Sequence, residues 1–294
     1  MEAERRREYS RIVRATSTGT AFVFAGGGNR GAVHVGQLRA LFERGITPDL
    51  VVGTSVGALN GAVVARDPHP DVAHEMLRMW QTDEARAVFG QSWASQAGRV
   101  VRGRTYTLSA RPLVTLISLH FPPLARIEDL ELPFVTVATS IERAVEQSFD
   151  SGPLVPAVVA SASVPGLLPP TVINHEHYLD GGLVASVPLG QAVRRGATTI
   201  YVLQAGQLDK QLKVPTSMME TLNVYVDITR RHSFTHAMDH VPEGVTVHVL
   251  PTGGRPRVRG LKALMSLEHT EERADLAYQA SVVELDRIAG RYPT

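Results

Sequence analysis

Two short apolar runs near the start of the chain are each followed at once by glycines and then by a helix-like segment. TAFVFA covers residues 20–25 and runs into GGGNRG, whereas DLVV covers residues 49–52 and runs into GTSVG. Continuous β-prone runs of this kind are typical of strands buried on both faces of a sheet. Strand, loop, helix, strand, turn and helix in this order predict a βαβ unit. We therefore expect an α/β fold, a three-layer sandwich whose mostly parallel central sheet is covered by helices.

The segments between and after these runs have helical character. AVHVGQLRALFERG places apolar residues at helical spacing and ends on Gly45, a suitable left-handed C-cap. VGALNGAVVAR, residues 56–66, is rich in small residues that suit close packing against a sheet. A closing amphipathic helix is predicted from Ser266 onward. Further strands are predicted at residues 133–139, 198–205 and 245–250.

Composition narrows the class of protein. A chain of 294 residues with 44% apolar content can bury a full core. Its net charge of +1 gives no field that would argue for a nucleic-acid partner. Cysteine is absent, which excludes disulfides, thiolate zinc sites and a cysteine nucleophile. This usage fits a reducing, cytoplasmic compartment.

Residues 1–17 form a basic extension with five arginines. Polar residues follow these arginines where a signal peptide would need an apolar stretch, so no signal peptide is predicted. No run in the chain approaches the length of a transmembrane helix. The extension is either a solubilising tail or an aid to peripheral membrane contact.

Ser55 lies between Gly53 and Gly57 in GTSVG, the GxSxG pattern of a nucleophile elbow. In such a strand-to-helix turn the flanking positions must be small, and the serine hydroxyl lies at the positive end of the following helix. The pattern alone is weak, but its β-like and helix-like flanks are those that the turn requires. The alternative is a glycine-rich strand end with an incidental serine.

The loop GGGNRG has two interpretations. As Gly26, Gly28 and Gly31 it matches the dinucleotide fingerprint GxGxxG. That interpretation needs an acidic residue at the end of the second strand, but Asp49 opens that strand. Alternatively, the unobstructed backbone N–H groups of the glycines form an oxyanion hole beside Ser55. The position of GTSVG at the correct end of the second strand favours the oxyanion hole.

A serine nucleophile also needs a base. Many histidines follow the elbow, and none lies in a context that singles it out. His175 and His177 alternate as metal ligands on a strand would, but no third ligand is indicated, so no metal site is predicted. Asp180, in HYLDGG, follows a short β-like stretch and precedes two glycines, which suits a carboxylate in a crowded site. The alternative is a simple Asp-Gly turn.

The order GGGNRG, GTSVG, DGG resembles the patatin-like phospholipase family, whose pattern is GGGxRG, GxSxG and DG(G/A). The resemblance covers roughly residues 18–206, and ASASVPGLLPP at 160–170 is similar to the family's ASxAxP region. This chain departs from the pattern in two places. Leu167 and Leu168 stand where an aromatic residue is frequent, and Ser186 stands where asparagine often precedes proline.

The resemblance implies a patatin-like sheet and a Ser-Asp dyad. Ser55 would attack an ester carbonyl while Asp180 accepts its proton, and water would then release the acyl group. The resemblance assigns the negative charge of the intermediate to the backbone of Gly26, Gly27 and Gly28. An aspartate with an ordinary pKa near about 3.9 is a weak base, so its surroundings must offset that handicap.

Arg30 and Gly31 complete the loop. Arg30 either fixes the loop, or contacts a lipid phosphate, or pairs with an acidic neighbour. The implied enzyme is a lipid acyl hydrolase that uses no cofactor and cleaves carboxyl esters of phospholipids or related lipids. Two alternatives stay open, namely a nucleotide-binding protein that uses the glycine loop and a non-catalytic relative of the family.

We divide the chain into three parts. Residues 18–206 are the predicted catalytic domain, within which 68–126 are helical cover over the site. The apolar stretch 100–124 is either a lid or ordinary core. Residues 207–294 are a segment packed on the same domain. The oligomeric state is not predicted.

Overall fold

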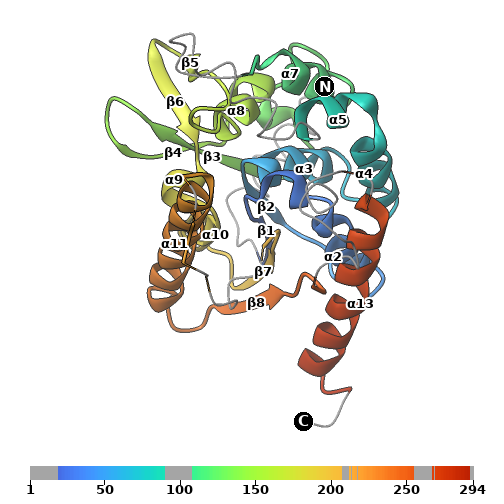
Figure 1. Ribbon diagram of the computed structural model, residues 1–294. Coiled ribbons are helices and arrows are strands. Elements are labelled where there is room, and N and C mark those ends of the chain that lie inside the picture. Colours follow the sequence, from blue (N-terminus) through green and yellow to red (C-terminus); the bar gives the residue numbers. More distant parts are fainter. Residues whose placement is uncertain are drawn as a thin grey trace.

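The computed structural model describes residues 19–89, 108–206, 212, 214–216, 218–254, 267 and 269–291, and a mixed sheet forms the centre of this part (Figure 1). Its strands are β1 (Thr20–Phe24), β2 (Leu50–Thr54), β3 (Phe134–Ser140), β4 (Val145–Phe149), β5 (Thr171–Ile173), β6 (Glu176–Asp180), β7 (Thr199–Leu203) and β8 (Thr246–Leu250). The helices are α2 (Val33–Phe42), α3 (Val56–Arg66), α4 (Val72–Gln81), α5 (Asp83–Phe89), α7 (Arg111–Ser118), α8 (Leu154–Ser161), α9 (Gly182–Ala185), α10 (Leu189–Arg194), α11 (Met218–Asp239) and α13 (Thr270–Ile288). Two short 3-10 helices are η1 (Gly28–Arg30) and η3 (Ile127–Asp129).

The sheet has the strand order β5-β6-β3-β2-β1-β7-β8, and β4 also pairs with β3. Strands β3, β2, β1, β7 and β8 run parallel, whereas β4, β5 and β6 pair in antiparallel fashion. The carboxyl ends of the parallel strands therefore meet at one edge. Open α/β sheets bind their ligands at this edge.

Both faces of the parallel strands β1, β2, β3 and β7 are buried, as their continuous apolar runs predict. In β1, Phe22 and Phe24 pack on one face, in the same core as residues of α2, α3, α4 and α13. Ala21 and Val23 pack on the other face, with residues of α10 and α11. Figure 1 shows α13 and α11 on opposite sides of the sheet. The prediction of a three-layer α/β fold is confirmed.

The predicted strands correspond to β1, β2, β3, β7 and β8, with ends that differ by one or two residues. Gly45 has φ 68°, the left-handed conformation predicted for it, and lies two residues after Glu43, which caps α2. The antiparallel strands β4 and β5, and helix α8, were not predicted. These elements are short, and α8 contains a proline, so the local pattern identifies none of them.

The predicted extension 1–17 lies wholly outside the described residues. Positions 90–107 of the helical cover, which include the start of the stretch 100–124, and the start of the closing helix at 266 also lie outside them. Helices α4, α5 and α7 lie within the rest of the predicted cover. In the C-terminal segment, β8 extends the sheet beside β7, and α13 packs on α2. Among the helices that the structure describes, none combines the length and apolarity that crossing a bilayer requires.

Candidate active site

Strands β2 and β6 both pair with β3, and their carboxyl ends face each other there. Thr54, the last residue of β2, lies opposite Val137 of β3, and Asp180, the last residue of β6, lies opposite the next residue, Ala138. Because β2 is parallel to β3 and β6 is antiparallel to it, both strands point their carboxyl ends at this position. The residue after β2 is Ser55, so the register of two strand pairs brings Ser55 and Asp180 together.

Ser55 occupies the sharp turn that GxSxG predicts. Its backbone has φ 58° and ψ −125°, a strained conformation for a residue with a side chain, and α3 begins at the next position. A Cβ added at Gly53 would lie 2.3 Å from the carbonyl oxygen of Gly57, and one added at Gly57 would lie 2.2 Å from that of Phe24. Both elbow positions therefore require glycine for steric reasons.

The Ser55 hydroxyl donates a hydrogen bond of 2.6 Å to Oδ2 of Asp180. The other carboxylate oxygen, Oδ1, accepts the backbone N–H of Gly182 at 2.6 Å. Ser55 is 8% exposed and Asp180 is 6% exposed. The pair is thus buried, aligned and held at both carboxylate oxygens.

Burial raises the pKa of Asp180 from 3.8 to about 6, and the hydrogen bonds from Ser55 and Gly182 oppose this rise. Burial disfavours the charged form of a carboxyl group, whereas donors directed at the carboxylate favour it. A carboxylate with this pKa is a stronger base than an exposed aspartate and is still ionised at neutral pH. A buried hydroxyl–carboxylate pair of this kind can generate a nucleophilic oxygen.

Ser161, from helix α8, holds the backbone of Ser55 in place. Ser161, at the end of α8, accepts the backbone N–H of Ser55 at 2.9 Å and donates to the carbonyl of Val137 at 2.5 Å. Thr139 donates to the carbonyl of Asp180 at 2.9 Å. Sequence reasoning did not assign these roles to Ser161 and Thr139, although ASASVPGLLPP drew attention to the segment that contains Ser161.

The three glycines of the loop differ in their hydrogen bonding. The Gly26 N–H donates to the carbonyl of Ser186 at 2.8 Å. Within the part of the chain that the structure describes, the N–H groups of Gly27 and Gly28 have no hydrogen-bond partner. An added Cβ at Gly27 would lie 2.3 Å from Cβ of Ala205, whereas Gly28 has φ 58° and open space beside it. Two of the three predicted donors are therefore available to an oxyanion.

Arg30 and Gly31 lie at the end of this loop. Arg30 Nε donates a long hydrogen bond of 3.4 Å to the carbonyl of Gly27. An added Cβ at Gly31 would lie 2.5 Å from side-chain atoms of both Trp80 and Val56. Gly31 is thus wedged between α4 and the start of α3, and this packing fixes the position of the loop relative to Ser55.

A buried polar network joins α3 to the glycine loop. Asn60 Nδ2 donates to the carbonyl of Gly31 at 3.0 Å and lies 3.0 Å from Nδ1 of His34. Trp80 Nε1 donates to Oδ1 of Asn60 at 3.3 Å. Burial lowers the pKa of His34 to about 3, so its ring is neutral and can accept at Nδ1. This network was not predicted from the sequence. The one local indication was an asparagine, Asn60, among the small residues of the predicted helix.

A cavity of about 260 Å³ opens beside Ser55, and its wall is mostly apolar. It is bounded by the elbow, by α5, by the segment around α7 and by the segment after α8. The described residues that line it are Gly28, Ser55, Val56, Leu59, Ala87, Val88, Phe89, Leu108, Ser109, Pro112, Leu113, Ala162, Val164, Leu167 and Leu168. Leu167 and Leu168, which depart from the family pattern, thus belong to this wall.

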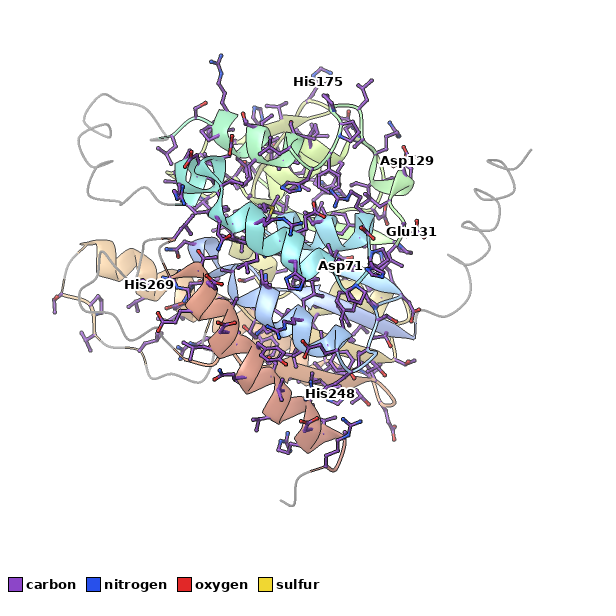
Figure 2. All side chains as sticks on the ribbon, turned by 90° about the vertical axis from the view of Figure 1, so that its right-hand side faces the viewer. Asp71, Asp129, Glu131, His175, His248 and His269 are labelled. Carbon is purple, nitrogen blue, oxygen red and sulfur yellow. The ribbon has the colours of Figure 1, made fainter. Side chains whose placement is uncertain are left out.

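The candidate residues for a dinucleotide site or a metal site do not lie beside Ser55. Asp49 accepts the backbone N–H of Thr20 at the amino end of β1, at the opposite edge of the sheet from the glycine loop. His177 pairs with Glu142 at 2.6 Å. Among the residues that the structure describes, no three histidine or acidic side chains come together as metal ligands. Figure 2 shows Asp71, His175 and His248 widely separated over the molecule.

Two solved structures align with most of this chain over part of their own length. VipD from Legionella pneumophila aligns with a TM-score of 0.45 and 13% identity, covering 92% of this chain and 67% of that chain. The type III effector protein ExoU aligns with a TM-score of 0.43 and 14% identity, covering 92% of this chain and 53% of that chain.

Comparison with curated proteins gives longer relatives. The chain is 33% identical over 213 residues to Patatin-like phospholipase domain-containing protein ZK370.4 of Caenorhabditis elegans, covering 70% of this chain and 15% of that protein. It is 28% identical over 226 residues to Lysophospholipase NTE1 of Kluyveromyces lactis, covering 76% of this chain and 15% of that protein. The chain therefore spans about 15% of the length of the curated relatives that it matches.

The family model described as patatin-like phospholipase matches residues 22–193. That range contains the glycine loop, the elbow and Asp180. Because the match spans more than half of the chain and includes all three motifs, the protein belongs to the patatin-like phospholipase family.

Proposed function

We propose that the protein is a lipid acyl hydrolase in which Ser55 is the nucleophile and Asp180 is the general base. The observation that carries the proposal is the buried hydrogen bond of 2.6 Å from the Ser55 hydroxyl to the Asp180 carboxylate. The hydroxyl lies at the amino end of α3 and beside the glycine loop. A nucleophile, a base and oxyanion donors are the three components that acyl transfer needs.

The reaction proceeds in two halves. As Ser55 Oγ attacks the ester carbonyl, Asp180 takes the hydroxyl proton, and the N–H groups of Gly27 and Gly28 stabilise the negative oxygen of the tetrahedral intermediate. The intermediate collapses to an acyl-enzyme, and the departing alcohol receives the proton from Asp180. Water then transfers a proton to Asp180 and attacks the acyl-enzyme. As the second tetrahedral intermediate collapses, Asp180 returns this proton to Ser55 Oγ, and the carboxylic acid departs.

The cavity beside Ser55 supports a substrate with an acyl chain. Its mostly apolar wall would take the hydrocarbon part of the ester, because removing such a chain from water is favourable. The head group would remain toward the outside, so phospholipid, lysophospholipid and glycolipid esters all fit this arrangement. Peripheral contact with a membrane and a cytoplasmic location remain predictions from the sequence.

Covalent labelling with a fluorophosphonate probe tests the assignment of the nucleophile. The wild-type protein is expected to take up one probe and Ser55→Ala none. Ser109→Ala is the matched control, because Ser109 lines the same cavity without a contact to Asp180, and this variant should label like the wild type. Absence of labelling in the wild type would favour a non-catalytic relative, and tight binding of a dinucleotide would favour the nucleotide-binding alternative.

We expect ester hydrolysis to rise with pH through about 6. The base must be ionised, and the pKa of Asp180 is about 6 because of its burial. Below this value kcat/KM should fall about tenfold for each pH unit, and above about pH 7 it should level off. Initial rates on a p-nitrophenyl ester between pH 4.5 and about 8.5 measure the profile. A midpoint above about 7.5 would contradict the assignment of Asp180.

Loss of the Asn60 amide is expected to slow turnover more than it weakens binding. Asn60→Ala removes the hydrogen bond to the carbonyl of Gly31, so the glycine loop can shift relative to Ser55. A displaced oxyanion hole should lower kcat by about 10-fold to 100-fold with a small change in KM. Val64→Ala is the control, because it removes buried volume one turn further along α3 and leaves the bond from Asn60 to Gly31, so its kcat should match that of the wild type. An Asn60→Ala protein with wild-type kcat would contradict this positioning role.

A further inference from the structure

Helix α7 is buried on one side, whereas its other side and the turn after it expose large apolar side chains. We define the α7 face by its exposed residues Arg111, Val114, Thr115, Ser118, Leu119 and Leu124. Val114 is 38% exposed, Leu119 55% and Leu124 90%. Residues three and four positions apart share one side of a helix, so the helical members of this face form a continuous strip. Apolar side chains that gather on a surface often mark contact with a partner or a membrane.

The charge around the α7 face is positive. Arg111 is the charged residue of the face itself, and it lies at the start of the helix. In the sequence, no aspartate or glutamate occurs between Glu84 and Glu128, whereas this stretch contains six arginines. Anionic lipid head groups attract basic surfaces, and apolar side chains can enter the boundary between head groups and acyl chains. The composition of the α7 face therefore matches the surface of an anionic bilayer.

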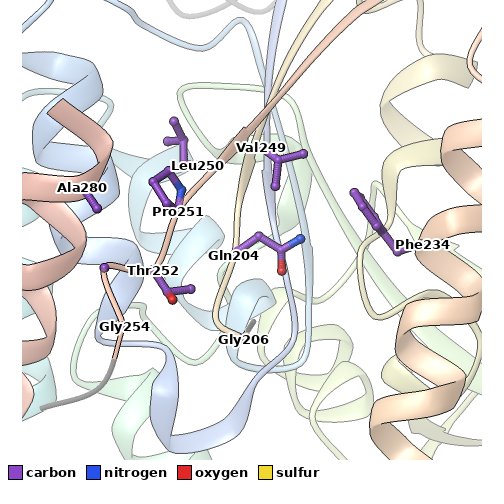
Figure 3. A pocket seen from close by; sticks show the side chains of 10 residues that line it. Gln204, Gly206, Phe234, Val249, Leu250, Pro251, Thr252, Gly254 and Ala280 are labelled. Atoms are coloured by element: carbon purple, nitrogen blue, oxygen red, sulfur yellow. The ribbon is translucent and has the colours of Figure 1, made fainter. Parts of the chain in front are cut away.

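The same helix forms part of the wall of the cavity beside Ser55, to which it contributes Pro112 and Leu113. A second cavity, of about 470 Å³, lies at the ends of β7 and β8, between Phe234 of α11 and Ala280 of α13 (Figure 3). None of the described residues that line this second cavity belongs to α7. The α7 face therefore accompanies the cavity that would take the acyl chain of the substrate.

Strand β5 lies at the same end of the molecule as α7, whereas β8 and the end of α13 lie at the other end (Figure 1). It adds another exposed apolar side chain, Val172, which is 55% exposed. The nearby acidic side chains have partners, because Glu176 forms an ion pair with Arg143 at 2.5 Å and Glu142 lies 2.6 Å from Nδ1 of His177. Paired carboxylates repel an anionic surface less than isolated ones.

We propose that the α7 face docks on a bilayer that contains anionic lipids, with Leu119 and Leu124 inserted among the head groups and Arg111 beside lipid phosphates. Docking would bring the cavity beside Ser55 to the bilayer surface, so an acyl chain would enter it without passing through water. The choice of a lipid partner rests on the proposed function, whereas docking itself requires no catalysis.

Co-sedimentation of the full chain with vesicles of phosphatidylcholine and phosphatidylglycerol tests the proposal. We expect Leu119→Glu to bind these vesicles about tenfold or more weakly than the wild type, because glutamate removes an apolar contact and repels anionic head groups. Leu124→Glu should weaken binding in the same direction. Val283→Glu is the matched control, because Val283 is 58% exposed on α13, and its affinity should equal that of the wild type.

The contribution of charge is measured with Arg111→Gln. This variant should bind the mixed vesicles about fivefold more weakly, and its binding to vesicles of phosphatidylcholine alone should equal that of the wild type. Arg291→Gln is the control, because Arg291 follows α13 and its side chain is 67% exposed. Equal losses in the two arginine variants would show a general effect of net charge and would contradict a role for Arg111.

Hydrolysis of dissolved p-nitrophenyl butyrate separates docking from chemistry. Leu119→Glu should cleave this ester at the wild-type rate, because Leu119 is not among the described residues of the cavity wall. Docking through α7 is overturned if the wild type does not bind the vesicles, or if Leu119→Glu binds them as well as Val283→Glu does. It is also overturned if the wild type is a dimer that Leu119→Glu dissociates, because the face would then pair two copies. Vesicle binding without fluorophosphonate labelling would instead overturn the proposed function and support docking.

Discussion

Replacing Asp180 by asparagine is expected to lower kcat for ester hydrolysis by about 10³-fold or more, because the variant has no base to accept the Ser55 proton. The same change is expected to stabilise the fold. Raising the pKa of a buried carboxyl group from 3.8 to about 6 corresponds to about 3 kcal/mol of lost stability at neutral pH. An asparagine carries no charge and still has an oxygen to accept the N–H of Gly182, so it avoids this loss.

The pH dependence of the stability difference between Asp180→Asn and the wild type distinguishes the loss of a buried charge from a general improvement in packing. The folded-state pKa of Asp180 lies above the unfolded value, so the wild type loses this stability as the pH rises from about 4 through about 6. Asp180→Asn should therefore exceed the wild type by up to about 3 kcal/mol at pH 8 and by much less at pH 4. Urea unfolding at both pH values measures the difference. An equal gain in stability at both pH values would contradict a raised pKa for the buried Asp180.

Replacing Gly57 by alanine is expected to lower the free energy of unfolding by about 3 kcal/mol or more. The added Cβ would lie 2.2 Å from the carbonyl oxygen of Phe24, so α3 and β1 would have to move apart. That movement also separates Ser55 from the glycine loop, which follows β1. Whatever protein still folds should therefore hydrolyse esters at least about tenfold more slowly.

Gly61→Ala is the matched control, since Gly61 lies one turn further along α3. There an added Cβ would lie 3.1 Å from a side-chain atom of Val51, which can adjust, and alanine favours a helix over glycine. We expect its stability to stay within about 1 kcal/mol of the wild type, with unchanged kcat. Urea midpoints and ester hydrolysis rates of the two variants measure both effects, and similar values for both would show that the elbow tolerates a side chain.

The sequence was sufficient to predict the parts of the site that follow strands. Buried parallel strands appear as continuous apolar runs, and the glycines around Ser55 and Asp180 reflect steric limits that act within a few residues. The close approach of the two side chains was predicted only through a family resemblance. Its physical cause is the register of β2 and β6 on β3, which depends on pairing between distant segments.

Other features of the site depend on tertiary contacts alone. Ser161 is one of many serines in the sequence, and only the packing of α8 brings it to the backbone of Ser55. Asn60 lies in a helix of small residues, and its role depends on α4 placing Trp80 beside it. The raised pKa of Asp180 likewise results from burial, which no local pattern reveals.

Because β2 and β6 meet end to end on β3, we expect Ser55 and Asp180 to come together late in folding. β1 and β2 are joined through one helix, whereas Ser55 and Asp180 are 125 positions apart in the chain. Contacts between distant segments form slowly, because closing a long loop costs chain entropy. A refolding chain should thus regain its helices before it takes up the fluorophosphonate probe, and the return of probe uptake would time the docking of β6 on β3.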